Sequence, residues 1–153
     1  MKIDLKIIVD GIEMQTNESQ TFFNTKSGKI LLFTDEELEI AESKQDISEY
    51  VQWMQDAINN VRKYLEEQDD YIELPTEYEF HEYHVMEKFI LSLPHESQRE
   101  ELYYSIKGKG AFAKFKHGLE RYSLTDEWYK YRDKAVVKLA KNWCDENAIE
   151  VNK

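Results

Sequence analysis

The segment GKGAFAKFKH, residues 108–117, combines two glycines with three lysines and has the residue types of an anion-binding loop. The first N–H groups of a helix that begins near residue 110 lack acceptors within the helix, and the helix dipole makes that end positive. Gly108 and Gly110 would let a phosphate approach the backbone, and Lys107 and Lys109 add positive charge. The spacing differs from that of a Walker A loop, and no third glycine completes a dinucleotide-binding motif.

An ordinary helix boundary explains the same segment without a ligand, and we favour it. Glycine is enriched just after helix ends, so Gly108 would end one helix in a left-handed conformation before the next begins at about residue 110. A helical wheel divides this second helix into two faces. We expect the apolar face to pack in the core and the basic face to meet solvent: Phe112, Phe115 and Leu119 against Lys114, His117 and Arg121.

A stripe of lysines follows the last predicted helix, from about Thr125 to Asn147, opposite an apolar face that includes Trp128 and Trp143. Such a stripe would suit an acidic protein or nucleic acid, although an amphipathic core helix with solvated lysines is the favoured interpretation. The candidate anion- or partner-binding residues are Lys107, Gly108, Lys109, Gly110, Lys114, Lys116, Arg121, Lys130, Lys134, Lys138 and Lys141.

Acidic residues and two histidines suggest an alternative, a small enzyme that uses residues 77–84. Residues 66–82 contain eight Asp and Glu and no Lys or Arg, and His81 and His84 would share one face of a helix near Glu77. Two histidines three apart are only half of a metal site, and no HExxH or GxSxG motif is present. We therefore predict no metal, cofactor or catalytic residue, and a buried structural thiol at Cys144.

The composition indicates a small acidic protein of 153 residues with a formal net charge of −11. Residues 1–100 carry 9 Lys and Arg against 23 Asp and Glu, whereas residues 101–153 carry 11 against 8. This acidity argues against non-specific nucleic-acid binding, which depends on phosphate neutralisation, but leaves room for a local basic site. Acidic and basic parts would also attract each other, within a chain or between two copies.

The cysteine content and hydropathy predict a cytoplasmic protein without a membrane segment. A single cysteine excludes an intramolecular disulfide, which suits a reducing compartment. Charged residues interrupt the N-terminal segment MKIDLKIIVDGIE, as they would not in a signal peptide, and the apolar run at Ile30–Phe33 is much shorter than a membrane span.

The elements that position these residues are β-hairpins over 1–33 and helices over 34–153. We expect residues 2–9 to form a strand that turns at Asp10-Gly11, and residues 21–24 and 29–33 to pair across Gly28. Thr34 and Glu37 predict a capping box, and Thr76 and Glu79 a second one.

Further helices are expected over about 47–67, before Pro94, over 95–106 and over 110–121, with Tyr71–Leu74 extended. The helix over 47–67 has an apolar stripe formed by Tyr50, Trp53, Met54, Ile58, Val61 and Leu65. We predict one α+β domain over 1–153, in which a small antiparallel sheet precedes a mostly helical part.

Four blocks of the sequence resemble the UPF0158 family of uncharacterised bacterial proteins: YIELP (71–75), MEKFILSL (86–93), GKGAFAKFKHGL (108–119) and EWYKYRDKAVVKLAKNWCDENAI (127–149). The resemblance covers about half of the chain and implies no activity, cofactor or catalytic residue. It implies that one structural unit contains Gly108, Gly110, Phe112, Phe115, Lys116, Trp128 and Trp143.

These observations favour a non-enzymatic binding or interaction module with segregated acidic and basic faces. Its partner would be a protein or a second copy of the chain, with nucleic acid the less favoured ligand. A second hypothesis is a protein-directed regulator in which the acidic run at residues 66–82 docks a basic partner.

Overall fold

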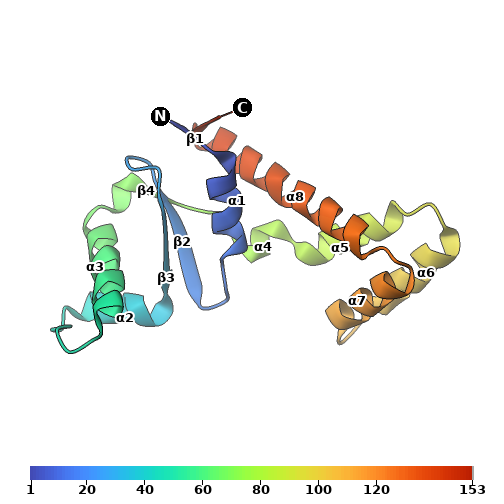
Figure 1. Ribbon diagram of the computed structural model, residues 1–153, viewed down its shortest axis with the longest axis horizontal. Coiled ribbons are helices and arrows are strands. Elements are labelled where there is room, and N and C mark those ends of the chain that lie inside the picture. The colour runs from blue at the N-terminus through green and yellow to red at the C-terminus, as the bar shows by residue number, and fades with distance from the viewer. Residues whose placement is uncertain (153) are drawn as a thin grey trace. The chain divides into compact units, whose positions relative to one another are not determined.

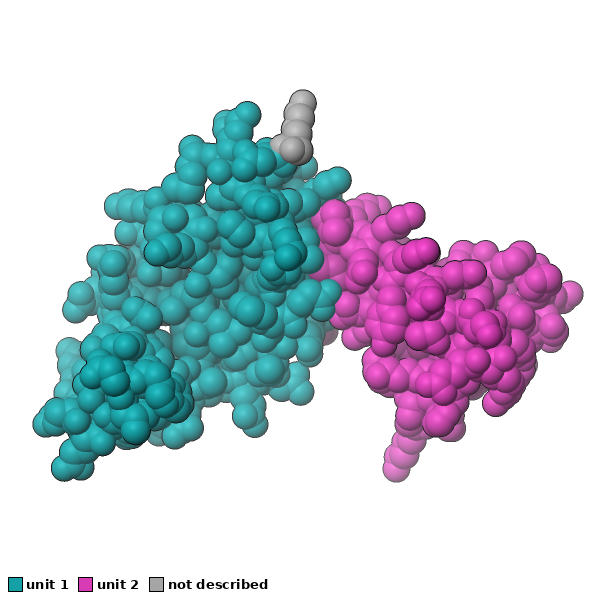
Figure 2. Space-filling model, in the orientation of Figure 1, with its two compact units in different colours: residues 1–77, 140–153 teal, residues 78–139 magenta. Residues whose placement is uncertain are grey.

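The computed structural model describes residues 1–152, and its contacts divide the chain into two compact units (Figure 2). Unit 1 comprises Met1–Glu77 and Ala140–Lys153, and unit 2 comprises Tyr78–Leu139. Helices dominate and most strands lie in the N-terminal part, so the predicted α+β class is confirmed. That residues 1–153 fold as a single domain stays a prediction.

Unit 1 contains the β-sheet structure of the described chain (Figure 1). Its elements are β1 (Lys2–Ile3), α1 (Leu5–Glu13), β2 (Ser19–Asn24), β3 (Ile30–Thr34), α2 (Asp35–Ser43), α3 (Gln52–Glu66), the 3-10 turn η1 (Gln68–Asp70), β4 (Tyr71–Glu73) and β5 (Glu150–Val151). The antiparallel sheet has the order β3-β2-β4, and β1 pairs with β5 in parallel. The pairing of β1 with β5 explains why the two ends of the chain belong to one unit.

The prediction of a strand over residues 2–9 with a turn at Asp10-Gly11 is wrong, because helix α1 occupies this segment. Asp4 caps the helix by accepting a hydrogen bond from the Lys6 N–H at 2.9 Å. Ile8 and Ile12, four residues apart, are buried on one face. A Cβ on Gly11 would lie 2.6 Å from the Leu74 side chain, so this glycine permits close packing and does not mark a turn.

The second predicted hairpin and the first capping box are confirmed. Strands β2 and β3 pair antiparallel, with Phe23 opposite Ile30, and Gly28 in their connection has a φ of 73°. At the start of α2 the Thr34 N–H donates to Glu37 Oε1 at 2.9 Å, and the Glu37 N–H donates to Thr34 Oγ1 at 3.1 Å.

Alternating residues of β2 give the sheet two different faces, and helices cover both (Figure 1). On one face Phe22 stacks on Phe33 at 5.6 Å, and Tyr64 of α3 packs on both rings. On the other face Phe23 and Trp143 pack edge-to-face at 6.0 Å, and the Trp143 indole N–H donates to the Glu73 carbonyl at 3.0 Å. Trp143 therefore packs a distant part of the sequence against the sheet.

The expectation that Trp53 belongs to the apolar stripe of its helix is wrong, since this side chain is 70% exposed. Helix α3 begins at Gln52 rather than near residue 47, and its buried residues are Ile58 and Val61. Trp53 precedes Ile58 by five residues, which is about 140° around the helix. Its side chain therefore points away from the sheet.

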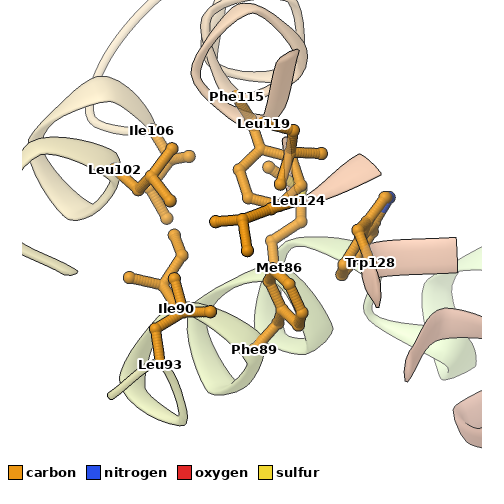
Figure 3. Packing of buried hydrophobic residues seen from close by; sticks show 10 residues of the cluster. All are labelled: Met86, Phe89, Ile90, Leu93, Leu102, Ile106, Phe115, Leu119, Leu124 and Trp128. Carbon is orange, nitrogen blue, oxygen red and sulfur yellow. The ribbon is translucent and has the colours of Figure 1, made fainter. Parts of the chain in front are cut away.

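Unit 2 is helical. Its elements are α4 (Glu77–Phe80), α5 (Glu82–Leu91), α6 (Glu96–Ser105), α7 (Ala111–Arg121) and most of α8 (Thr125–Glu146), whose last turns lie in unit 1. The predicted helices over 95–106 and 110–121 and the long last helix are confirmed. The core packs residues of α5 to α8 together (Figure 3): Met86, Phe89, Ile90, Leu93, Leu102, Ile106, Phe115, Leu119, Leu124 and Trp128.

Aromatic contacts at the centre of this core join three helices. The Trp128 ring lies 4.9 Å from Phe115 and 5.4 Å from Phe89, in edge-to-face geometry in both pairs. Nearby, α6 and α7 approach closely at Gly118, where a Cβ would clash with the fully buried Leu102 side chain. The absence of a side chain at residue 118 therefore sets the spacing of α6 and α7.

We expect Gly118→Ala to destabilise the protein, although alanine favours an isolated helix by about 1 kcal/mol. Overpacking against the buried Leu102 costs about 1–3 kcal/mol, so the clash outweighs the gain in helix propensity. Urea unfolding followed by circular dichroism measures the change. Ala113→Gly, at an exposed position of the same helix, is the control for propensity alone. A stability of Gly118→Ala above that of the native protein would contradict the tight packing of α6 on α7.

Candidate functional site

The junction between α6 and α7 has the backbone that a helix boundary requires. Gly108 and Gly110 have φ values of 83° and 71°, so the left-handed conformation expected of Gly108 is confirmed. Apart from the glycine itself and its two neighbours in the chain, no described residue has a heavy atom within 4 Å of where a Cβ on Gly108 or Gly110 would be. Both glycines are therefore explained by backbone conformation and not by close contact with another part of the described chain.

The predicted faces of α7 are confirmed except at one residue. Phe115 and Leu119 are buried, and Lys114, His117 and Arg121 are exposed. Phe112, which we expected in the core, is 45% exposed. It occupies the first turn of α7, beside the exposed residues 107–110, and the Lys116 ammonium lies 4.7 Å from its ring centroid in a cation–π contact.

Besides Lys116, two more of the predicted basic site residues interact with neighbouring side chains. The Lys107 ammonium donates to the Tyr103 hydroxyl at 3.2 Å and lies 4.2 Å from the centre of that ring. This hydrogen bond raises the pKa of Lys107 above its usual value. Arg121 forms an ion pair with Glu101. Their charges are therefore partly committed to contacts within unit 2.

The remaining lysines of the predicted surface are exposed, and within residues 1–152 they form no ion pair: Lys109, Lys114, Lys116, Lys130, Lys134, Lys138 and Lys141. All but one of them lie in unit 2; Lys141 belongs to unit 1. We call the six in unit 2, Lys109, Lys114, Lys116, Lys130, Lys134 and Lys138, the free lysine set.

The two units differ in charge, as the two parts of the sequence do. Unit 2 carries 11 Lys and Arg against 10 Asp and Glu, a net charge of +1, whereas unit 1 carries 9 against 21, a net charge of −12. The four histidines also lie in unit 2: His81, His84, His95 and His117. The acidic charge of the protein is therefore concentrated in the unit that contains the sheet.

The arrangement expected of residues 77–84 is wrong, because no continuous helix contains both histidines. His81 has a left-handed φ of 54° between α4 and α5, and its ring lies 6.4 Å from that of His84. His84 lies 3.6 Å from Glu87, and Glu82 accepts a hydrogen bond from Arg132 at 2.8 Å. Among the described residues, no group of three or more His, Cys, Asp or Glu is arranged to hold a metal ion.

The thiol of Cys144 is buried, as predicted, with 1% of the residue exposed. Burial raises its pKa above the usual range, and the nearby charge of Asp145 acts in the same direction. A raised pKa lowers the thiolate fraction at neutral pH, which is the opposite of what a nucleophilic cysteine needs.

Two tryptophans that the family resemblance implied in one structural unit lie in different units. Trp128 is in the core of unit 2, and Trp143 packs on the sheet of unit 1. Comparison with protein-family models, curated proteins and solved structures finds no match to this chain. No helix within residues 1–152 combines the length and apolar character needed to cross a membrane.

Sequence reasoning missed the exposed aromatic residues of unit 2. Tyr104, in the last turn of α6, is 75% exposed. Tyr129, which precedes Lys130 in α8, is 48% exposed. The signal available was the position of Tyr104 two residues after Leu102, because two residues correspond to about 200° around a helix and place Tyr104 opposite the core-facing leucine.

We expect Gly108→Ala and Gly110→Ala each to lower the free energy of unfolding by about 1 kcal/mol, because a Cβ disfavours a left-handed backbone. Gly108→Asn and Gly110→Asn should lower it less, since asparagine tolerates this conformation. Thermal and urea unfolding measure both series. Equal stability of the alanine and native proteins would show that backbone conformation does not select these glycines.

We expect Cys144 to react slowly with a disulfide reagent at pH 8 in the native protein and rapidly in urea. Burial blocks access to the thiol, and its raised pKa keeps it protonated. Absorbance of the released thiolate gives both rates. A native rate close to that in urea would contradict the buried thiol.

Proposed function

We propose that this chain is a non-enzymatic interaction module in which the free lysine set of unit 2 binds an acidic protein partner. The observation that carries the proposal is that six exposed lysines of one unit have no carboxylate partner within residues 1–152. Unit 2 contains nearly as many acidic residues as basic ones. A shortage of carboxylates therefore does not explain why these lysines lack ion-pair partners.

Exposed aromatic residues near the lysines support a binding role. Tyr104 and Phe112 flank the junction that carries Lys109, and Tyr129 adjoins Lys130. Tyrosine and phenylalanine are enriched in protein interfaces, where large rings supply contact area while surrounding charges steer the partner. A second copy of the chain is one acidic protein that meets this description, because unit 1 carries a charge of −12.

Single-stranded nucleic acid is a second candidate, favoured by the same combination of exposed rings and lysines. Bases stack on aromatic side chains while ammonium groups neutralise phosphates. The overall charge of −11 opposes this candidate, because long-range repulsion weakens binding to a polyanion.

The cellular location and the family assignment belong to the proposal as well. We place the protein in the cytoplasm because its one cysteine is a free thiol. Membership of the UPF0158 family rests on the four sequence blocks alone and adds no functional residue.

Binding of fluorescent poly-glutamate and of oligo-dT, measured by anisotropy over a range of salt concentrations, tests the proposal. We expect poly-glutamate to bind at low salt, and Lys109→Gln combined with Lys114→Gln, Lys130→Gln and Lys134→Gln to weaken it at least about tenfold, since each exposed charge contributes a few tenths of a kcal/mol. A control with the same charge change carries Lys2→Gln, Lys6→Gln, Lys26→Gln and Lys44→Gln in unit 1 and should bind nearly as the native protein does.

Three outcomes separate the candidates. Tighter binding of oligo-dT than of poly-glutamate would replace the protein partner by nucleic acid. Self-association that disappears at high salt in sedimentation, and is lost in the unit 2 variant, would identify a second copy as the partner. Binding of neither probe, or equal losses in the two variants, would contradict the role of the free lysine set.

A further inference from the structure

A pocket of about 350 Å³ opens in unit 1 at the end of the sheet, between the β2–β3 hairpin and α3. Its volume is in the range of small-molecule sites. The residues that line it are Asn24, Ser27, Lys29, Ile30, Leu31, Asn60, Lys63 and Tyr71. The pocket lies in the acidic unit and is distinct from the free lysine set.

The lining of this pocket is rich in donors and contains no carboxylate. Lys29 and Lys63 supply two ammonium groups, and Asn24 and Asn60 two side-chain amides. Unit 1 carries 21 Asp and Glu against 9 Lys and Arg, so this lining has the opposite sign of charge from the unit that contains it.

The two lysines are also not neutralised by acidic residues nearby. Within residues 1–152, neither Lys29 nor Lys63 forms an ion pair. Asp70 lies in η1, between α3 and β4, and does not line the pocket. Its carboxylate forms an ion pair with the Lys26 ammonium at 3.3 Å. An anion in the pocket would therefore meet two uncommitted positive charges.

The local fold fixes the amide of Asn24 as a donor. Its Oδ1 accepts hydrogen bonds from the Lys26 N–H at 2.8 Å and the Ser27 N–H at 3.0 Å. Since the oxygen is used in the turn, the Nδ2 group remains available to a ligand. The sheet register places Tyr71 opposite Asn24, on the face that α3 covers.

Aromatic and aliphatic groups form the rest of the wall. The Tyr71 ring packs edge-on against Tyr64 at 5.2 Å, and Tyr64 in turn packs on Phe22 and Phe33. Leu31, which pairs with Phe22 on this face of the sheet, adds aliphatic surface. The pocket thus combines a cationic, donor-rich part with a wall anchored in the core of unit 1.

We propose that this pocket binds a small organic phosphate monoester. Two ammonium groups balance the nearly dianionic charge of a phosphate monoester at neutral pH, and its oxygens accept several hydrogen bonds from ammonium and amide donors. The apolar wall at Leu31 and Tyr71 contacts the organic part of the ligand. A divalent cation is disfavoured, because the lining offers it two positive charges and no carboxylate.

The test is a titration of the ¹⁵N-labelled full-length chain with phenyl phosphate, followed by NMR. We expect saturable shifts of the Asn24 and Asn60 side-chain amides, with weaker binding of inorganic phosphate, which lacks the apolar group, and of benzenesulfonate, which carries a single negative charge. Lys29→Gln and Lys63→Gln should each weaken phenyl phosphate binding about tenfold, as expected for the loss of one charged hydrogen bond.

Lys26→Gln is the matched control, because it makes the same charge change on the same hairpin outside the pocket. It should change the affinity less than about threefold. Absence of saturation by the native protein at about 10 mM phenyl phosphate, or equal affinities of the native protein and the double variant Lys29→Gln/Lys63→Gln, would overturn the proposal. Neither result would affect binding by the free lysine set, which lies in the other unit.

Discussion

The packing of Trp143 on the sheet is the contact on which unit 1 depends. Its ring packs perpendicular to that of Phe23, and its indole N–H donates to the carbonyl of Glu73 on β4. One side chain thus supplies both apolar burial and a hydrogen-bond donor to the short strand β4, which pairs with β2. With Phe22 and Phe33 covered by α3, this contact completes the second face of the sheet, and both faces of β2 are buried by helices.

The two units bury apolar surface in similar ways but differ in how they treat charge. Unit 2 packs helices around Phe89, Phe115 and Trp128 and leaves six lysines unpaired on its surface. Unit 1 is strongly acidic, yet two lysines from the hairpin and α3 line a pocket that contains no acidic residue. The local charge of the free lysine set and of the pocket is therefore positive, whereas the net charge of the protein is negative.

The elements that could be predicted from sequence are those set by local chemistry. The capping box at Thr34, the turn at Gly28 and the boundaries of α7 and α8 depend on residues close in sequence. Residues 2–9 were misassigned because a short run of isoleucines fits a strand and a helix equally well, and only contact with the sheet decides between them. Other features depend on which elements become neighbours in the fold. These are the exposure of Trp53 and Phe112, and the shared pocket of Lys29 and Lys63. Periodicity within one segment does not contain that information.

The parallel pairing of β1 with β5 has a consequence for folding during synthesis. Unit 2 is synthesised before Trp143 and β5, so unit 1 lacks these two segments for as long as the chain has been made only to the end of unit 2. During that interval the sheet has neither Trp143 over Phe23 nor a partner for β1. Strand β1 must therefore wait until β5 has been made, and until Trp143 packs on the sheet one apolar face stays open to other chains or a chaperone.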